Sequence, residues 1–358
     1  MSDNNTVIIA AGGTGGHVFP ALAVADELKS RNVNVLWVGS ERGMESTLVP
    51  AHGLPLHTLR VSALRGKGVM HRLGSALRLL TSIVRSVTLI RNEKPRAVLG
   101  MGGYVAGPVC VAARLCRTRT IMHEQNAVAG MTNRIVKKFA TRVLEAVPGT
   151  FAADVGAVHT GNPVRKDILN LSSPEQRIAV REGAIRILVV GGSQGAQTLN
   201  QWLPQACGMG ALNVSIRHQA GKGRAESTRD AYAGCDATVE VSEFVDDMAA
   251  AYEWADLLIC RAGAMTVAEV SAVGVASLLV PYPYAVDDHQ TANGQFLVQA
   301  DAAVMLQESD LTAAVLHDYL KTLCADRQRL LEMATNARRA GNRNATELVV
   351  NEILGEAA

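Results

Sequence analysis

The chain has 358 residues, of which 48% are apolar and 19% are charged, and its formal net charge is +2. This length is too great for one compact core and predicts two domains, and the apolar content excludes an intrinsically disordered chain. No apolar stretch approaches the ~20 residues of a transmembrane helix, and residues 1–6 lack the basic segment of a signal peptide. The six cysteines form no Cys-x-x-Cys pair, so we expect reduced core thiols.

Charge is divided unevenly between the two halves. Residues 1–163 carry 19 Lys and Arg against 9 Asp and Glu, a net of +10, whereas residues 164–358 have a net of −8. The first half is therefore expected to face an anionic partner, either nucleic acid or a membrane surface. Because only 4% of the residues are aromatic and no recognition module is evident, we expect no nucleic acid.

The first half begins with a strand that enters a glycine-rich turn. Residues 6–11 form a short β-branched run, residues 12–17 read Gly-Gly-Thr-Gly-Gly-His, and an apolar-periodic helix follows. A second strand is predicted over residues 33–39, and a third over residues 97–99, which enters another glycine-rich turn at residues 100–107. Strands that alternate with helices predict a parallel sheet covered by helices.

The same pattern restarts in the second half. Residues 185–190 are a buried-strand run that enters Gly-Gly-Ser-Gln-Gly at residues 191–195 and then a helix. A later strand over residues 257–260 turns through residues 261–264 into another helix. The join between the domains is predicted near residues 161–163, which have turn chemistry, so the domains are expected to span 1–163 and 164–340.

The two glycine-rich turns are candidate anion sites. A strand that ends in glycines and opens a helix presents backbone N–H groups and the positive end of the helix dipole. Neither turn is a Walker loop, and the first departs from the dinucleotide fingerprint because Val18 stands where a third glycine is needed. His17, at the first turn of the helix, is suited to general-base work. The alternative for the glycines is that they only allow a tight connection between strand and helix. The alternative for His17 is a capping or positioning role.

Polar residues follow several other strands. Glu269 lies in the helix after residues 261–264 and could accept hydrogen bonds from a ribose diol. A polar cluster, His123-Glu124-Gln125-Asn126, follows an apolar run, as ligand sites do in open α/β sheets. No Asp-x-Asp occurs, so no dedicated metal site is expected, and helix N-termini are expected to stabilise a leaving diphosphate.

Residues 65–96 are strongly basic and amphipathic. They contain eight Lys and Arg against the single acid Glu93, and apolar residues recur at helical spacing through Leu77, Leu80 and Val84. This pattern predicts a helix that binds an anionic membrane surface. The alternative is an ordinary helix whose apolar stripe packs on the sheet, and part of the stripe is expected to do so.

Several motifs stand in the order that one enzyme family shows. They are Gly12-Gly13-Thr14-Gly15-Gly16-His17-Val18-Phe19-Pro20, Gly100-Met101-Gly102-Gly103-Tyr104-Val105, His123-Glu124-Gln125-Asn126, Gly161-Asn162-Pro163-Val164-Arg165, Gly191-Gly192-Ser193-Gln194-Gly195 and Glu243-Phe244-Val245-Asp246-Asp247-Met248. Over essentially its whole length the chain resembles the peptidoglycan N-acetylglucosaminyltransferases of glycosyltransferase family 28.

The resemblance implies an α/β fold of the GT-B type, with two doubly wound Rossmann-like domains facing a central cleft. Residues 341–358 are expected to pack back on the first domain. The implied reaction moves N-acetylglucosamine, with inversion, from UDP-N-acetylglucosamine to undecaprenyl-diphospho-muramoyl-pentapeptide. The resemblance further implies a peripheral protein at the cytoplasmic face of the bacterial inner membrane and no cofactor.

The resemblance also implies roles for individual residues. His17 is expected to accept the proton, Glu269 to hold the ribose, and Val245 to offer backbone groups to the uracil; His17 and Glu269 are the catalytic candidates. Tyr104, His123 and Glu124 are expected around the acceptor. The full set of expected substrate contacts is Thr14, Gly15, Gly16, Asn126, Arg165, Ser193, Val245, Ala264, Met265, Thr266, Val267, Ala268, Glu269 and Gln290.

Three other functions are compatible with parts of the sequence. A UDP-N-acetylglucosamine 2-epimerase of the same architecture would use the same donor without a lipid-linked acceptor. A Rossmann oxidoreductase would bind a dinucleotide, which the missing third glycine argues against. A non-catalytic membrane adaptor would not need His17, Arg165 and Glu269 together.

Overall fold

The computed structural model describes residues 5–60, 69–192, 194–210 and 212–356, and for residues 69–73 and 75 it describes the backbone alone. The chain divides into two compact units. The first unit contains Met1–Arg165 and Arg343–Ala358, and the second contains Lys166–Asn342. Each boundary lies two residues after the position expected from the sequence, so Arg165 belongs to the first unit.

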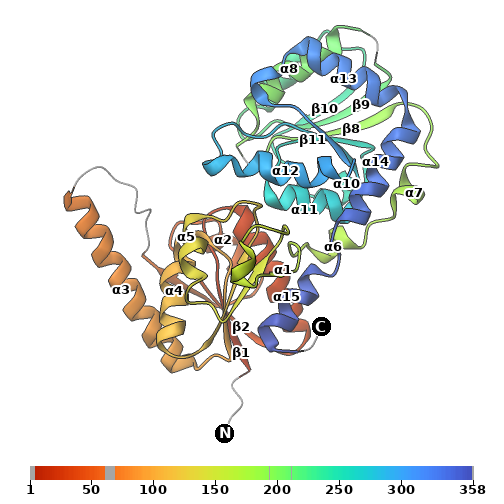
Figure 1. The fold of residues 1–358 in the computed structure, drawn as a ribbon. Helices are drawn as coiled ribbons and strands as arrows, with labels where there is room; N and C mark the ends of the chain where they lie inside the picture. The colour runs from red at the N-terminus through yellow and green to blue at the C-terminus, as the bar shows by residue number, and fades with distance from the viewer. Residues whose placement is uncertain (1–4, 61–68, 193, 211, 357–358) are drawn as a thin grey trace. The chain divides into compact units, whose positions relative to one another are not determined.

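Within the described residues, the first unit is built on one seven-stranded sheet in which every pair of neighbouring strands is parallel (Figure 1). The strand order is β3-β2-β1-β4-β5-β6-β7. The strands are β1 (Thr6–Ala10), β2 (Asn34–Ser40), β3 (Leu56–Leu59), β4 (Ala97–Gly100), β5 (Arg119–Glu124), β6 (Arg142–Glu145) and β7 (Val158–His159). β1 is buried on both faces, as its β-branched sequence predicts.

Helices cover both faces of this sheet. They are α1 (Gly15–Ser30), α2 (Glu45–Ala51), α3 (Val69–Glu93), α4 (Gly103–Leu115), α5 (Met131–Val136) and α15 (Ala345–Leu354). α1 and α15 pack on the face that carries Val7 and Ile9, and α3 and α4 pack on the face that carries Ile8 and Ala10. The C-terminal helix α15 thus completes the core of the first unit.

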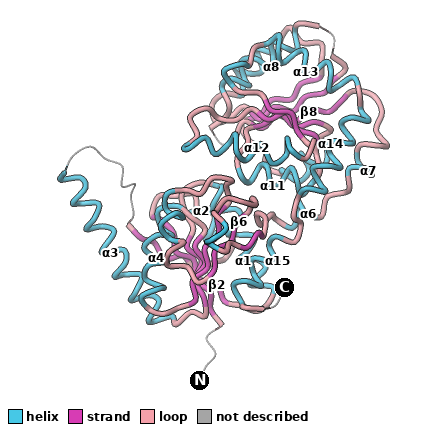
Figure 2. Tube along the Cα trace, in the orientation of Figure 1, coloured by secondary structure: helices cyan, strands magenta, loops and turns pink. Residues whose placement is uncertain are grey.

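The second unit repeats the doubly wound arrangement, with six parallel strands in its described part (Figure 2). The strand order is β10-β9-β8-β11-β12-β13. The strands are β8 (Ile185–Val190), β9 (Val214–Gln219), β10 (Thr238–Ser242), β11 (Leu257–Cys260), β12 (Ala276–Leu279) and β13 (Ala303–Met305). The prediction of two doubly wound parallel sheets is confirmed.

Helices also cover the sheet of the second unit. They are α6 (Lys166–Leu169), α7 (Pro174–Arg177), α8 (Gln197–Gly208), α9 (Ala225–Ala231), α10 (Met248–Trp254), α11 (Ala264–Val273), α12 (His289–Gln299), α13 (Ala313–Ala325) and α14 (Arg327–Ala340). Side-chain caps mark several of their starts: Asp247, Thr312 and Asp326 accept hydrogen bonds from backbone N–H groups of α10, α13 and α14.

A buried arginine joins two helix ends in the second unit. The Arg177 side chain is 2% exposed, and its guanidinium donates to the main-chain oxygens of Tyr252 and Ala255 at the end of α10. It also donates to the main-chain oxygens of Val273 and Gly274 at the end of α11. These carbonyls lie at the C-terminal ends of the two helices, and the positive charge lies where both helix dipoles are negative.

We expect Arg177→Leu to lower the free energy of unfolding by about 3 kcal/mol, because the buried Gly274 carbonyl loses its donor and the other three carbonyls each lose one of two donors. Urea unfolding at neutral pH measures the change. Arg339→Leu is the matched control, since Arg339 is exposed on α14 and its loss should change the stability by less than about 0.5 kcal/mol. Equal stability of the two variants would contradict this role of Arg177.

Candidate functional site

In both units the glycine-rich turns lie at the point where the strand order reverses. β1 is flanked by β2 and β4, and β8 is flanked by β9 and β11, so successive connections leave these strands in opposite directions. Open parallel sheets bind ligands beyond the carboxyl ends of the strands at such a point. The turn after β1 and the turn after β4 share one such edge, and the turns after β8 and β11 share the other.

In the first unit the two turns touch through their backbones. Gly103 has a φ of +74°, and a Cβ there would lie 2.3 Å from the main-chain oxygen of Gly12. A Cβ on Gly102, with a φ of +97°, would lie 2.9 Å from the His17 ring. Glycine is therefore required at both positions, and the ring of His17 lies directly against the turn after β4.

Glu45, at the start of α2, fixes the first glycine-rich turn through buried hydrogen bonds. Its carboxylate is fully buried and accepts hydrogen bonds from the backbone N–H of Gly13 (3.0 Å), the backbone N–H of Ser40 (2.8 Å) and the Ser40 hydroxyl (2.6 Å). Burial raises the pKa of Glu45, but the hydrogen bonds from Ser40 and Gly13 outweigh it and the pKa is lowered. Glu45 therefore stays charged and fixes the turn.

His17 is half-buried in the first turn of α1, and Thr14, the residue just before this helix, is exposed. Its backbone N–H donates to the main-chain oxygen of Thr14, and its ring Nδ1 lies 3.0 Å from Oε1 of Gln125. Tyr104, at the start of α4, is 56% exposed and is available to a ligand. The structure thus brings Thr14, Gly15, Gly16 and His17 to one edge of the sheet.

His123 and Glu124 lie beneath this surface. The His123 side chain is fully buried and Glu124 is 1% exposed, so neither can touch an acceptor directly in this conformation. Glu124 accepts hydrogen bonds from the Asn126 backbone and side chain, from the Gly130 N–H and from the Asn133 side chain. Glu124 thereby orients Asn126, which is itself half-buried.

Arg165 belongs to the first unit, whereas the second glycine-rich turn belongs to the second unit. Its guanidinium carbon lies 5.8 Å from the centroid of the Phe19 ring, a cation–π arrangement with a residue of α1. This contact holds the positive charge of Arg165 near the N-terminal turns of α1.

In the second unit the turn after β8 packs against the loop after β9. Gly195 has a φ of +70°, and a Cβ there would lie 2.1 Å from the main-chain oxygen of Ala220. Gly221 is constrained in the same way, since its Cβ would lie 2.5 Å from the Gly195 nitrogen. The turn therefore opens α8 with its backbone N–H groups held in place. Ser193, predicted to lie near the diphosphate, falls outside the described residues.

Gln219 connects this turn to the loop that carries Val245. Its side-chain Nε2 donates to the main-chain oxygens of Gly192 (3.0 Å) and Glu243 (2.8 Å). The side chain is 4% exposed, and its Oε1 is buried without a hydrogen-bond partner among the residues that the structure describes. A buried oxygen of this kind can accept from a ligand N–H or O–H.

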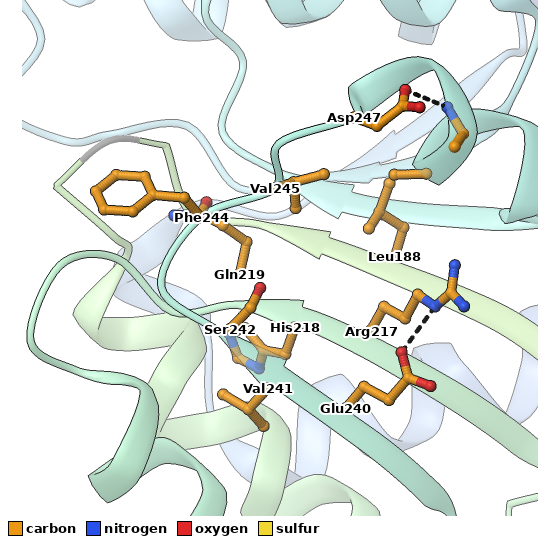
Figure 3. Close-up of a pocket in the computed structure, with 12 residues that line it drawn as sticks. Leu188, Arg217, His218, Gln219, Glu240, Val241, Ser242, Phe244, Val245 and Asp247 are labelled. Atoms are coloured by element: carbon orange, nitrogen blue, oxygen red, sulfur yellow. Dashed lines mark hydrogen bonds and ion pairs between the residues drawn. The ribbon is translucent and has the colours of Figure 1, made fainter.

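A cavity of about 270 Å³ opens beside these loops (Figure 3). The ends of β9 and β10, the loop that carries Phe244 and Val245, and the start of α10 line it, and Asp247 caps α10 at its upper rim. This volume is just below the ~300–1,000 Å³ of typical small-molecule sites. The cavity can therefore hold part of a nucleotide-sugar, such as its base.

The start of α11 carries six of the fourteen predicted substrate contacts, residues 264–269. Ala264, Met265 and Val267 are buried, whereas Thr266 and Glu269 are half-buried and have side chains that a ligand can reach. The Tyr252 hydroxyl donates to Oε2 of Glu269 at 2.9 Å, which fixes this carboxylate.

Gln290 lies at the start of α12 and supports the neighbouring loop. Its Oε1 accepts a hydrogen bond from the backbone N–H of Tyr282 at 2.9 Å. Tyr282 and Tyr284 of that loop are both exposed. The amide nitrogen of Gln290 can still donate to a ligand.

The outer surface of α3, formed by Leu77, Arg78, Leu80, Val84 and Arg85, is exposed to solvent. Among the α3 side chains that the structure describes, the buried ones are Ser82, Ser86 and Ile90. The apolar stripe predicted to pack partly on the sheet therefore faces outward between arginines. Leu73 and the basic residues 65, 67 and 72 have side chains outside the described part. No helix in that part is long and apolar enough to cross a membrane.

Sequence reasoning missed three residues of this site. Glu45, Gln125 and Gln219 are polar, almost completely buried, and lie at or near the ends of strands or their connections. The only signal for them was a polar residue beside a glycine-rich stretch or within a quoted motif. No group of three or more potential metal-binding side chains gathers among the described residues.

Known proteins resemble both units. The model of the glycosyltransferase family 28 N-terminal domain matches residues 7–145, and that of the C-terminal domain matches residues 186–349. A Marinobacter nauticus protein named UDP-N-acetylglucosamine--N-acetylmuramyl-(pentapeptide) pyrophosphoryl-undecaprenol N-acetylglucosamine transferase is 48% identical over 355 residues, which cover 99% of this chain and 98% of that protein. A protein of the same name from Xanthomonas euvesicatoria is 48% identical over 352 residues, 98% of this chain and 81% of its own length.

Comparison with solved structures also finds similar proteins over nearly the whole chain. The crystal structure of Acinetobacter baumannii MurG superposes with a TM-score of 0.87 at 41% identity, covering 98% of this chain and 99% of that one. UDP-GlcNAc 2-epimerase from Neisseria meningitidis, solved with UDP-GlcNAc bound, has a TM-score of 0.68 at 11% identity over 98% of this chain and 99% of that one. The epimerase likeness shows a shared fold alone.

We expect Glu45→Gln to destabilise the protein by about 1–3 kcal/mol at pH 7, because an amide cannot accept from Gly13 and Ser40 together. The lowered pKa means that the carboxylate stabilises the fold above its ordinary pKa of 4.5, and that this contribution is lost as the pH falls through the lower folded-state pKa. The difference in the free energy of unfolding between wild type and Glu45→Gln should therefore become smaller as the pH falls below about 4.5.

Urea unfolding at pH 7 and pH 3.5 measures this difference. Glu41→Gln is the control, because Glu41 is exposed and pairs with the exposed Arg60. A Glu45→Gln penalty that stays constant between the two pH values would show that the carboxylate charge does not hold the turn.

Proposed function

Because the chain belongs to glycosyltransferase family 28, we propose that it transfers N-acetylglucosamine from UDP-N-acetylglucosamine to the 4-hydroxyl of undecaprenyl-diphospho-N-acetylmuramoyl-pentapeptide. The transfer inverts the anomeric centre and forms the lipid-linked disaccharide precursor of peptidoglycan. One observation carries this assignment: the chain is 48% identical, over 99% of its length, to a relative whose name states this transfer.

The second unit is the proposed donor-binding unit. We infer that the uracil lies at the loop of Val245 beside the cavity, and that Glu269, already held by Tyr252, binds the ribose. Thr266 and Ser193 would face the diphosphate at the starts of α11 and α8, where backbone N–H groups and helix dipoles favour negative charge. Gln290 would contribute through its amide nitrogen.

The first unit is the proposed acceptor-binding unit. His17 accepts the proton of the muramoyl 4-hydroxyl while that oxygen bonds to the anomeric carbon and the bond to UDP breaks. The exposed Tyr104 and the turn at residues 14–16 contact the acceptor, whose own diphosphate suits the positive end of α1. Arg165 supplies a fixed positive charge that favours the leaving UDP.

We further propose that the protein is peripheral at the cytoplasmic face of the inner membrane. The outer surface of α3 presents leucines and valine between arginines, and this combination binds anionic lipid headgroups while its apolar side chains enter the interface. The acceptor is itself lipid-linked, so binding of the protein to the membrane raises the rate of encounter.

We expect label from UDP-N-acetylglucosamine to enter the lipid fraction only when the lipid-linked muramoyl acceptor is present. His17→Ala should lower kcat by about 100-fold or more while the KM for the donor stays within about threefold. Glu269→Ala should instead raise the KM for the donor by about tenfold, because it removes ribose binding.

His57→Ala is the matched control, since His57 is exposed on β3 and should leave both constants unchanged. Conversion of the donor without acceptor would indicate an epimerase instead. Near-normal turnover of His17→Ala with intact donor binding would remove His17 as the base.

We expect the protein to sediment with vesicles that contain phosphatidylglycerol but not with vesicles of phosphatidylcholine alone. The double variant Arg78→Glu/Arg85→Glu should weaken binding by about thirtyfold or more, because each basic residue near the surface contributes about 1 kcal/mol. The control Lys222→Glu/Arg339→Glu changes the net charge equally on exposed residues of the second unit. Equal losses in both double variants would show that net charge, not the α3 surface, governs binding.

A further inference from the structure

Four groups of the first unit form a continuous chain of hydrogen bonds. The His17 Nδ1 lies 3.0 Å from Oε1 of Gln125, and the Gln125 Nε2 lies 3.2 Å from Nδ1 of His123. The His123 Nε2 in turn lies 3.0 Å from the main-chain oxygen of Gly161. Gln125 is 1% exposed and His123 is fully buried, so water does not compete for the contact between these two side chains or for that of His123 with Gly161.

The buried end of this series of hydrogen bonds determines which atom donates and which accepts in each of them. A main-chain oxygen can only accept, so Nε2 of His123 carries a proton that it donates to Gly161. Burial lowers the pKa of His123 to about 4, although the Gly161 hydrogen bond and the charge of Glu124 oppose it, so the ring is neutral at neutral pH. Its Nδ1 is therefore an acceptor.

The orientation of the Gln125 amide follows from that acceptor. Only the amide nitrogen can donate to Nδ1 of His123, and the same nitrogen also lies 3.2 Å from the His123 main-chain oxygen, a second acceptor. The amide oxygen must then face His17. Because this oxygen can only accept, Nδ1 of His17 carries the proton, and in the neutral ring the lone pair lies on Nε2.

Further contacts fix the positions of Gln125 and of the His17 ring. The Asn162 side chain donates to the main-chain oxygen of Gln125 at 2.9 Å, which fixes the backbone of that residue. Gly102 lies against the His17 ring, so close that a Cβ would be 2.9 Å from it. The ring therefore has the turn after β4 on one side and the Gln125 amide at Nδ1.

We propose that Gln125 is the positioning residue of His17, because its amide holds the proton on Nδ1 and so presents Nε2 as the proton acceptor. The inference rests on the proposed role of His17. In the reaction the 4-hydroxyl proton moves to Nε2, the freed oxygen electron pair bonds to the anomeric carbon, and the bond to UDP breaks with its electrons on the diphosphate. The bond from Nδ1 to Gln125 persists, since an amide oxygen accepts equally from the charged ring.

Two substitutions separate positioning from packing. Gln125→Leu keeps a side chain of similar size and removes the hydrogen bonds of the amide to His17 and to His123. Gln125→Glu keeps an oxygen that accepts from Nδ1 of His17, whether the carboxyl is charged or protonated. If Gln125 acts by selecting the tautomer, the Glu variant should rescue what the Leu variant loses.

The tautomer is read directly from ¹⁵N–¹H correlation spectra of the full chain labelled at histidine nitrogens, with the His17 signals identified by their loss in His17→Ala. We expect wild type and Gln125→Glu to carry the His17 proton on Nδ1 at pH 8, and Gln125→Leu to show a mixture. A wild-type spectrum with the proton on Nε2 would overturn the proposal, even if neither variant folded.

Transfer kinetics complete the test. We expect Gln125→Leu to lower kcat by tenfold or more with the KM for UDP-N-acetylglucosamine within about twofold, and Gln125→Glu to recover most of kcat. A low kcat with an unchanged tautomer, or a mixed tautomer with normal kcat, would each overturn the proposal. If the tautomer is as expected but His17→Ala turns over normally, the proposed base fails while the hydrogen-bond chain stands.

Discussion

The close approach of two backbones at each strand-order reversal is the constraint on which the rest of the structure depends. Gly103 meets the Gly12 carbonyl in the first unit, and Gly195 meets the Ala220 carbonyl in the second, at distances that exclude any Cβ. Because these turns pack backbone to backbone, the helices that follow them begin at fixed positions beyond the carboxyl ends of the strands. The backbone N–H groups that can meet an anion are thereby set before any ligand arrives.

Buried polar side chains maintain these turns with opposite chemistry in the two units. Glu45 is an acceptor that satisfies backbone N–H groups of Gly13 and Ser40, whereas Gln219 is a donor that satisfies the carbonyls of Gly192 and Glu243. Each connects loops that are distant in sequence. A loop that is held before binding costs less ordering free energy when the ligand binds, so both side chains favour a preorganised site.

The chain belongs to glycosyltransferase family 28, and its proposed substrates are UDP-N-acetylglucosamine and a lipid-linked muramoyl-pentapeptide. The charge of its two units fits this pair of substrates. The basic first unit carries the outer surface of α3 and the turn of His17, where an anionic, membrane-anchored acceptor is proposed to bind. We propose that the acidic second unit meets the UDP diphosphate with backbone groups, which removes the need for an excess of basic side chains.

The sequence by itself determined the two doubly wound sheets, the glycine-rich turns and, through the order of its motifs, the family from which the proposed reaction follows. These features are local: a β-branched run, a glycine at positive φ or a motif is visible within a few residues. Only the tertiary structure decided that the leucines of α3 face outward, that His123 and Glu124 are buried, and that Glu45, Gln125 and Gln219 hold the turns. Gln125 lies 108 positions from His17, and the two meet because the strand order places β5 beside β4 and β4 beside β1. Local sequence does not encode that order, since it follows from how the helices pack on the whole sheet.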